Sequence, residues 1–350
     1  MTKFLIYGAT GYTGKLIARE AARRGFQPTL AGRNPEKVAA IAGECGLDHS
    51  AFELSDTAAL EAAISRHEAV LHVAGPFSAT AKPMVDACLK TGTHYMDITG
   101  EFDVLEATIA RGNEAGAAGV MLMSGVAFDV VPTDCLALHV AARISDPTHL
   151  TLAIKSNRGG ASRGTMKSGV ESMWKGPIER RDGHLVAPKG SLLFDVAGAG
   201  EPATYILMRW GDLVTAYQST GIANIRVGFE ARPELRKLVE LPAIVRFMMR
   251  FKVIQAMTKR AVDRGPEGPT EEQLETGRTE ITGIAENAKG DRAVSVLTVP
   301  QPHKLSAITA VEIAHRVANG AGRPGYLTPG QLFGADFITE FEGCSRVDIV

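Results

Sequence analysis

Cysteine, aromatic residues and net charge are all scarce in this chain of 350 residues. Its four cysteines, Cys45, Cys88, Cys135 and Cys344, form no Cys-x-x-Cys pair, which excludes a zinc ribbon or a thioredoxin-type motif. Dispersed thiols are typical of a reducing, cytoplasmic setting. The formal charge of −1 gives no overall field that would attract nucleic acid. We therefore expect a cytoplasmic protein with no nucleic-acid partner.

Long apolar runs are missing as well. No stretch of about 18 apolar residues lacks charge, so no transmembrane span is expected. The start, Met1–Tyr7, runs straight into glycines and is too short for the apolar region of a signal peptide. The hydrophobic fraction of 45% and the charged fraction of 22% are those of an ordinary globular protein. The length favours two domains, each large enough to bury a core.

The first 145 residues alternate between short apolar runs and helical stretches. Six strands are predicted, at Phe4–Tyr7, Pro28–Ala31, Ser50–Leu54, Ala69–Val73, Tyr95–Ile98 and Val120–Met123. Helices are expected after the N-caps Asn34 and Asp56 and from Pro83 to Gly92. Wholly apolar strands separated by helices indicate a parallel sheet covered on both faces. This part is predicted to be a Rossmann-type, doubly wound α/β domain.

The second half changes character, because its predicted strands are not regularly interleaved with helices. These strands are Leu150–Ser156, Thr204–Met208, Leu213–Tyr217, Asn224–Phe229, Glu280–Glu286 and Ala293–Val299. They favour a second, α+β domain with a mostly antiparallel sheet. The predicted division is 1–145 for the Rossmann-type domain and 146–304 for a substrate or oligomerisation domain. Residues 305–350 would add a helix, Ser306–Ala318, and a tail that packs back on the first domain.

A glycine-rich loop follows the first predicted strand, with the sequence Gly8-Ala9-Thr10-Gly11-Tyr12-Thr13-Gly14. Glycines between a first strand and a first helix permit a tight turn and close approach of a pyrophosphate to the backbone. The helix N-terminus then offers N–H groups and the positive end of its dipole. A P-loop is rejected, because that frame would start at Ala9 and Leu16 replaces the residue that holds magnesium.

The end of the second strand decides the choice of cofactor. An NAD site wants an acid there, but the sequence reads Ala31-Gly32-Arg33-Asn34. A guanidinium at Arg33 can grip the 2′-phosphate of NADP through paired hydrogen bonds. The alternative is a solvated Arg33 beside an Asn34 that only caps a helix. We predict NADP, bound in part by Arg33 and Asn34.

These residues resemble the saccharopine dehydrogenase-like oxidoreductase family. Further segments carry the resemblance along nearly the whole chain: Ala74–Phe77, His94–Glu101, Phe128–Asp134 and Pro324–Gly334. The chain looks most similar to a bacterial branch with the trans-acting enoyl reductases of lipid biosynthesis. The resemblance implies reduction of a carbon–carbon double bond by NADPH, whereas saccharopine reductases reduce an imine.

The resemblance also implies a set of cofactor contacts. Gly8, Ala9, Thr10, Gly11, Tyr12 and Thr13 would meet the pyrophosphate. Ala74, Gly75, Pro76 and Phe77 would border the ribose, where the strand order reverses. Gly100, Gly125, Phe128 and Asp129, together with Thr99, would border the nicotinamide.

The proton donor is expected among polar residues at strand ends. No Tyr-x-x-x-Lys pair exists, so short-chain dehydrogenase chemistry in its usual form is not expected. Tyr95, Asp97, Glu101 and Asp129 are the candidates, and Tyr95, Asp97 and Asp129 are retained as catalytic residues. The alternative for each aspartate is a structural role as an acceptor of loop N–H groups. His72 is expected to be a core histidine, and no metal site is predicted because no His-Glu-x-x-His motif occurs.

Two other segments carry charge. The turn Arg158–Gly164 is either a substrate or phosphate contact or a solvated hairpin loop. Residues 232–260 hold eight Lys or Arg and two Glu, with an apolar stripe at Ile244, Phe247, Met248 and Phe251. This segment is either a packed amphipathic helix or a peripheral contact with a membrane or an acyl carrier.

Three functions remain open from the sequence. The first is an NADP(H)-dependent oxidoreductase acting on an apolar or acyl substrate such as an enoyl lipid, expected as a homodimer. The second is an amino-acid reductase acting on an imine, with Arg158, Arg163 and Arg181 available for carboxylates. The third is a sensor that binds NADP without turnover.

Overall fold

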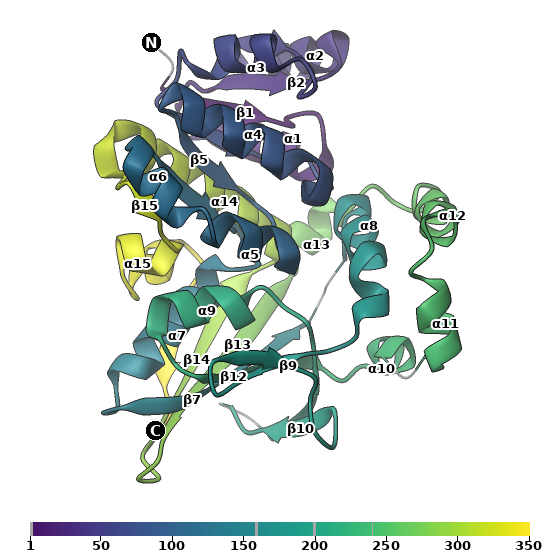
Figure 1. The fold of residues 1–350 in the computed structure, drawn as a ribbon, viewed down its shortest axis with the longest axis vertical. Coiled ribbons are helices and arrows are strands. Elements are labelled where there is room, and N and C mark those ends of the chain that lie inside the picture. Colours follow the sequence, from purple (N-terminus) through teal and green to yellow (C-terminus); the bar gives the residue numbers. More distant parts are fainter. Residues whose placement is uncertain (1–2, 158–159, 199–200, 240) are drawn as a thin grey trace. The chain divides into compact units, whose positions relative to one another are not determined.

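The chain folds into two compact units, and the computed structural model describes residues 3–157, 160–198, 201–239 and 241–350 (Figure 1). The first unit runs to Val131 and includes His303–Leu332, whereas the second consists of Pro132–Pro302 and Phe333–Val350. The units therefore depart from the predicted ranges 1–145, 146–304 and 305–350. Two packing arrangements account for the differences.

Residues 132–145 and 333–350 belong to the second unit because they pack on its sheet. The first helix of that unit, α7 (Val131–Ala142), lies against strand β13 (Arg278–Asn287) so closely that a Cβ on Gly283 would be 2.8 Å from Leu136 Cγ. Near the C-terminus, strand β16 (Ser345–Asp348) pairs antiparallel with β14 (Arg292–Pro300). The tail thus adds a strand to the second sheet.

The first unit contains a seven-stranded sheet whose neighbours all run parallel, in the order β15-β6-β5-β4-β1-β2-β3. Its strands are β1 (Phe4–Tyr7), β2 (Thr29–Gly32), β3 (His49–Ala51), β4 (Ala69–His72), β5 (His94–Asp97), β6 (Met121–Ser124) and β15 (Gly325–Tyr326). Successive strands are added on one side of β1 as far as β3 and on its other side from β4 onward. The gap between β1 and β4 is therefore the switch point of a doubly wound fold. The predicted α/β class is confirmed, and a strand forms at each of the six predicted places, although the third is His49–Ala51 instead of Ser50–Leu54. β15 is an additional strand.

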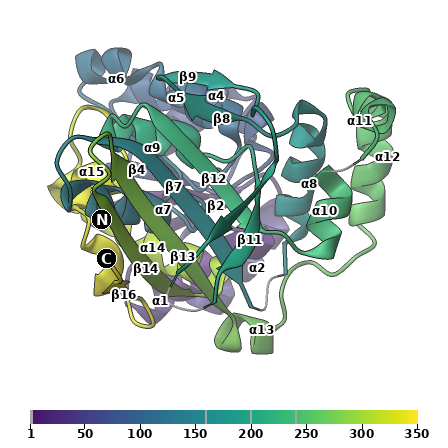
Figure 2. The ribbon, with the colours of Figure 1, turned by 90° about the horizontal axis from the view of Figure 1, so that it is seen from below.

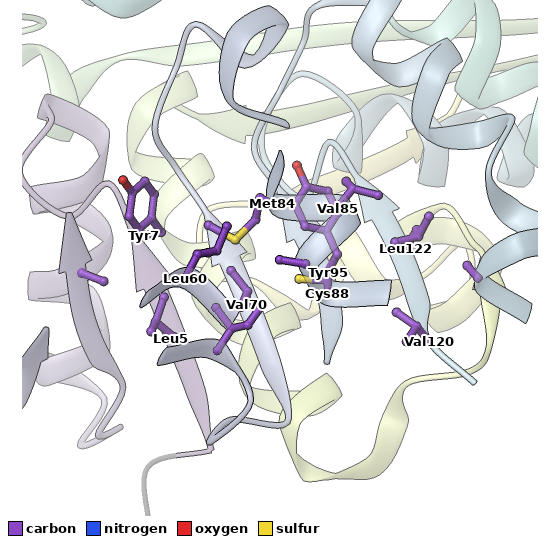
Figure 3. Packing of buried hydrophobic residues seen from close by; sticks show 14 of the residues in the cluster. Leu5, Tyr7, Leu60, Val70, Met84, Val85, Cys88, Tyr95, Val120 and Leu122 are labelled. Atoms are coloured by element: carbon purple, nitrogen blue, oxygen red, sulfur yellow. The ribbon is translucent and has the colours of Figure 1, made fainter. Parts of the chain in front are cut away.

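Helices occupy the crossovers of this sheet. They are α1 (Tyr12–Arg23), α2 (Pro35–Cys45), α3 (Thr57–Ile64), α4 (Phe77–Thr91), α5 (Phe102–Ile109), α6 (Gly112–Ala118), α14 (Pro302–Arg316), the π-turn η2 (Val317–Ala321) and α15 (Pro329–Phe333). β1, β2, β4 and β6 are buried along their whole length, as parallel strands between helical layers must be. In the core of this unit, Tyr7 and Tyr95 lie on either side of Met84 and Val70 (Figure 3).

The predicted start of the fourth helix at Pro83 is wrong. α4 begins at Phe77 and carries Pro83 in its interior. Proline is costly inside a helix because it removes a backbone hydrogen bond. The helix nevertheless starts early because the Glu101 carboxylate accepts hydrogen bonds from the N–H groups of Phe77 and Ser78, at 3.0 and 2.8 Å.

The second unit is built on a mixed sheet with the main order β10-β11-β12-β7-β13-β14-β16, while β8 pairs with β12 and β9 (Figure 2). Its other strands are β7 (Pro147–Ser156), β8 (Glu179–Arg181), β9 (His184–Val186), β10 (Leu193–Val196), β11 (Ala203–Leu207) and β12 (Asn224–Glu230). Only β7 and β12 pair in parallel among the described strands of this sheet. The predicted α+β character of this half, with a mostly antiparallel sheet, is confirmed.

Short helical elements surround this sheet in the described residues. They are α8 (Arg163–Ser172), η1 (Met173–Lys175), α10 (Pro233–Val239), α11 (Ala243–Met248), α12 (Lys252–Val262), α13 (Glu271–Thr276) and η3 (Phe337–Glu340). The predicted turn at 158–164 ends in the first residues of α8, and its residues 158–159 lie outside the described residues.

The predicted strand Leu213–Tyr217 is wrong, because these residues form helix α9 (Asp212–Thr220). The β-branched residues in this run favour a strand by propensity. The helix forms instead because it buries Leu213, Val214 and Ala216 together and ends at Gly221, which has a φ of +72°. Tertiary packing outweighs a propensity of this size.

Candidate active site

The residues predicted to bind the cofactor gather at the carboxyl edge of the parallel sheet. Each of β1, β2, β4, β5 and β6 is followed there by one of the predicted segments. Strands β5, β4, β1 and β2 lie next to one another and include the switch point between β1 and β4. A doubly wound sheet binds its ligand at the carboxyl edge beside that point.

Three glycines of the phosphate loop have different structural reasons to be glycine. Gly8 has a φ of +100°, and a Cβ there would be 2.6 Å from the backbone nitrogen of Ala74. A Cβ on Gly14 would be only 2.2 Å from the Gly8 carbonyl oxygen. At Gly11 the nearest atom would be 3.6 Å away, and the backbone has an ordinary φ of −76°. The fold itself requires Gly8 and Gly14, whereas a Cβ at Gly11 would make only an ordinary van der Waals contact.

Helix α1 begins immediately after Gly11, and no side chain caps its N-terminus. An anion is the natural partner of such a helix end. Tyr12, in the first turn, packs edge to face with His303 of α14, with ring centroids 5.4 Å apart. Burial lowers the pKa of His303 to about 4, so its ring is neutral at physiological pH. Sequence reasoning missed His303, since nothing in the local pattern links α14 to the loop.

Arg33 and Asn34 follow β2 and have distinct positions. The Asn34 side chain accepts a hydrogen bond from the Lys37 N–H at 2.9 Å and caps α2, so its predicted capping role is confirmed. Arg33 is exposed, and no carboxylate in the described part of the chain forms an ion pair with it. Its guanidinium is therefore available for an anion beyond β2.

The Ala74–Phe77 segment links β4 to α4 and contains a cis peptide bond between Gly75 and Pro76. The Glu101 carboxylate, which follows β5, binds the first N–H groups of α4. That carboxylate compensates the unsatisfied donors of a helix start. Glu101, one of the acids considered at the strand ends, therefore serves to join two neighbouring loops.

Asp97 lies at the centre of a saturated hydrogen-bond network. Its Oδ2 accepts from the hydroxyls of Tyr95 and Ser124, each at 2.8 Å. Its Oδ1 accepts from the N–H groups of Thr99 at 2.9 Å and Gly125 at 3.1 Å. The pKa of Asp97 is raised by burial, against the opposing effect of these four donors. The network ties the ends of β5 and β6 together.

This network also limits what Tyr95 can do. Its side chain is fully buried, and burial together with the Asp97 carboxylate holds its pKa well above the usual value. A phenol in that state does not release a proton near neutral pH. The geometry of Tyr95 and Asp97 fits the positioning of loops, and their predicted catalytic role finds no support in it.

Asp129 differs from both other carboxyl groups. It follows β6, and no residue in the described part of the chain donates a hydrogen bond to its carboxylate. Burial raises its pKa to about 7. Its carboxyl packs against the loop after β5, so closely that a Cβ on Gly100 would be 2.5 Å from Asp129 Oδ2. A group with such a pKa can both hold and release a proton at physiological pH.

The backbone around Asp129 is fixed from two sides. Gly125 has a φ of +82°, and a Cβ there would be 2.3 Å from Val130 Cγ2. The N–H of Phe128 donates to Ser306 Oγ at 3.2 Å, so α14 holds this loop. Ser306 and Ser124 hold the loops of this candidate site through hydrogen bonds, and sequence reasoning missed both.

His72, at the end of β4, is a core residue as predicted. It is fully buried, and its Nε2 lies 3.0 Å from Thr80 Oγ1. Since that hydroxyl donates to the Ala74 carbonyl oxygen, it accepts a hydrogen bond from His72. Burial lowers the pKa of His72 to about 3, so the ring is a neutral support beneath the Ala74–Phe77 segment.

Comparison with protein families gives a match over residues 4–123 to the saccharopine dehydrogenase NADP binding domain. The chain carries a saccharopine dehydrogenase-type NADP-binding domain. The predicted NADP cofactor and the resemblance to this family are confirmed over these residues.

Two mycobacterial relatives extend the comparison. A Mycobacterium tuberculosis protein, provisionally named a trans-acting enoyl reductase, is 33% identical over 180 residues, covering 48% of this chain and 43% of the relative. The trans-acting enoyl reductase of Mycobacterium ulcerans is 31% identical over 186 residues, covering 49% of this chain and 44% of the relative. The matched region therefore spans less than half the length of these relatives.

The fold has a counterpart over its whole length. Saccharopine dehydrogenase (L-Glu forming) from Saccharomyces cerevisiae superposes with a TM-score of 0.67, covering 100% of both chains at 11% sequence identity. Identity at this level shows a shared fold and carries no information about substrate.

The residues of the site fit NADP. The space beside Gly11 and the N-terminus of α1 suit a pyrophosphate, and a Cβ at position 11 would enter that space. Arg33 suits the 2′-phosphate because it is exposed at the end of β2 and meets no carboxylate in the described residues. Among the same residues, no cluster of His, Cys, Asp or Glu is arranged to hold a metal ion.

Proposed function

We propose that the chain is an NADPH-dependent reductase of an apolar enoyl substrate, with Asp129 as the proton donor. NADPH, when bound, supplies a hydride. Reduction of a carbon–carbon double bond also requires one proton, delivered to the carbon that does not receive the hydride. The observation that carries the proposal is a carboxyl group with a pKa of about 7 at the edge of the sheet.

Asp129 is suited to that role by its surroundings. Because burial is the cause of its raised pKa, the carboxyl is substantially protonated at neutral pH and able to donate. Neither of its neighbours can replace it. Asp97 is held by four hydrogen bonds, and Glu101 is engaged by the start of α4.

The class of substrate is supported by the names of the relatives, which are trans-acting enoyl reductases. An imine substrate derived from amino acids has less support from the described residues. Arg163 donates to the Gly265 carbonyl oxygen through Nε at 3.0 Å and also through Nη2. Arg181 forms an ion pair with Glu179. Two of the three arginines considered for substrate carboxylates are thus already engaged, and Arg158 lies outside the described residues.

The test is a reductase assay that follows the absorbance of NADPH with the full chain. Enoyl thioesters of increasing acyl length are one set of substrates, and glutamate mixed with an aldehyde is the other. We expect turnover with the enoyl thioesters that rises with chain length. Turnover only with the amino-acid mixture would assign an imine reductase, and NADPH binding without any turnover would assign a sensor; each result would overturn the proposal.

The role of Asp129 is tested with Asp129→Asn, using Asp48→Asn at an exposed site as the matched control. General acid catalysis typically contributes about 10²- to 10⁴-fold, so kcat of the first variant should fall within that range. Its affinity for NADPH should not change. In the unmodified protein, kcat should fall as the pH rises above about 7, and a flat profile would show that Asp129 does not donate the proton.

A further inference from the structure

Helices α11 and α12 of the second unit expose several large apolar side chains. Figures 1 and 2 both show α10, α11 and α12 grouped beside α8, away from the strands of the second sheet. Residues 241–262, which contain α11 and α12, are called the basic apolar segment here. Within the described residues, no helix has the length and apolar character needed to cross a membrane.

Large apolar side chains are exposed along this segment. Seven of them keep between 38% and 71% of their surface exposed, namely Ile244, Val245, Phe247, Met248, Phe251, Val253 and Met257. α12 buries none of its residues. Phe247 and Phe251 pack edge to face with ring centroids 5.6 Å apart, so these rings contact each other while both stay more than half exposed. Exposed large apolar side chains concentrated in one short segment mark an interaction surface.

The charge of the segment has only one sign. Residues 241–262 contain five Lys or Arg and no Asp or Glu. Lys259 pairs with Glu171 of α8, and Arg250 lies over the Trp174 ring at 5.6 Å. Lys252 and Arg260 are exposed, and no carboxylate of the described residues pairs with either. The side chain of Arg246 lies outside the described residues.

We propose that the basic apolar segment binds the surface of a membrane that contains anionic lipid. Apolar side chains bordered by cations are the composition of a helix that lies in the plane of a bilayer interface. The apolar side chains would enter the acyl boundary, while Lys252 and Arg260 would meet lipid phosphates. This inference is independent of the reductase proposal, because it involves neither the cofactor nor Asp129.

A second copy of the chain is a poorer occupant of this face. A two-fold interface brings the same patch of both copies together, and here it would place Lys252 and Arg260 of one copy near the same exposed cations of the other. Like charges at close range oppose association. An anionic lipid surface compensates these charges, whereas a copy of the same segment does not.

The test is flotation of the full chain with vesicles, without substrate or cofactor. Vesicles of phosphatidylcholine alone are compared with an equal mixture of phosphatidylcholine and phosphatidylglycerol, at low and high salt. We expect binding to the anionic vesicles that weakens as salt screens the charges. No binding to anionic vesicles at low salt would overturn the proposal.

Paired variants locate the surface. Lys252→Gln with Arg260→Gln should weaken binding by about tenfold to thirtyfold, from about 1 kcal/mol per cation near an anionic surface. Phe247→Ser with Val253→Ser should weaken it further. The matched controls are Arg66→Gln with Lys189→Gln for charge and Val347→Ser with Val350→Ser for exposed apolar surface. Equal losses in the test and control pairs would overturn the assignment to α11 and α12.

Trp174 provides a second readout, because η1 lies against α11 and its ring is 36% exposed. Brominated acyl chains should quench its fluorescence on binding, and Trp174→Phe should remove this quenching. Sedimentation equilibrium measures whether a second copy of the chain binds this face instead. A dimer that Phe247→Ser with Val253→Ser dissociates, in a protein that ignores vesicles, would assign the face to a second copy and overturn the proposal.

Discussion

Replacing Asp129 by Asn should make the protein more stable at alkaline pH. The substitution keeps the shape of the side chain and removes its charge. In the native structure the ionised carboxylate is costly, because it is packed against Gly100 and receives no hydrogen bond from the described residues. The effect requires no knowledge of the substrate and therefore tests the electrostatics of the site directly.

The magnitude follows from the displacement of the pKa. Below the ordinary value of 3.8 the carboxyl is protonated in both the folded and the unfolded chain and has no effect. As the pH rises towards about 7, the unfolded chain loses its proton first, so the unfolding free energy falls. A change from 3.8 to about 7 corresponds to at most about 4 kcal/mol. Asp129 as a residue is only partly buried, so a smaller value is expected.

The assay is chemical denaturation of both proteins near pH 5 and near pH 8.5. Between these values the advantage of Asp129→Asn should grow by about 1–3 kcal/mol. Any cost of the amide that does not depend on pH cancels in this difference. Asp48→Asn, at an exposed site, should show no such growth. If the advantage of Asp129→Asn stays constant between the two pH values, the carboxyl is not protonated by burial and the proton-donor argument fails.

Four other substitutions test the rest of the site. Arg33→Asp should weaken NADPH binding by about tenfold to a hundredfold in a fluorescence titration, and tighter binding of NADH than NADPH by the unmodified protein would refute the role of Arg33. Gly11→Val should abolish NADPH binding at an unchanged thermal midpoint, whereas Gly14→Val should lower that midpoint. A Cβ at Gly14 would clash with the Gly8 carbonyl oxygen at 2.2 Å, but a Cβ at Gly11 would lie at an ordinary 3.6 Å from it. The opposite pattern would contradict the loop assignment. Tyr95→Phe should lower the unfolding free energy by about 1–3 kcal/mol, since Asp97 loses a buried donor. An unchanged unfolding free energy in chemical denaturation would show that the Tyr95–Asp97 hydrogen bond does not stabilise the fold.

Local chemistry made much of the first unit predictable. Strand β1, the glycines and α1 occur together in one short stretch, and the Asn34 cap with Pro35 places the start of α2. Most of the six strands were recognisable because they are short and apolar and are followed by a helix signal; β3, His-Ser-Ala, is the exception. The cofactor could be predicted from Arg33 because the absence of an acid at that position is visible in the sequence itself.

Contacts between distant segments could not be predicted. The N-terminus of α4 is set by Glu101, which is 24 residues from Phe77. Strand β15 joins β6 across more than 200 residues of chain, and the loop at Phe128 is held by Ser306 from the late helix α14. Such partners leave no periodic signal, because a hydrogen bond needs one suitable atom at one position and not a repeated pattern.

The roles of the three acids at the sheet edge follow from hydrogen-bond partners and not from residue type. Asp97, Glu101 and Asp129 all follow or end neighbouring strands, and the sequence gives no reason to separate them. In the structure, four donors hold Asp97 and two N–H groups hold Glu101. Asp129 has neither arrangement, so burial alone acts on it and its pKa moves to about 7. An acid without donors is unfavourable for stability, and a folded protein that retains one beside its cofactor loop has the property that proton transfer requires.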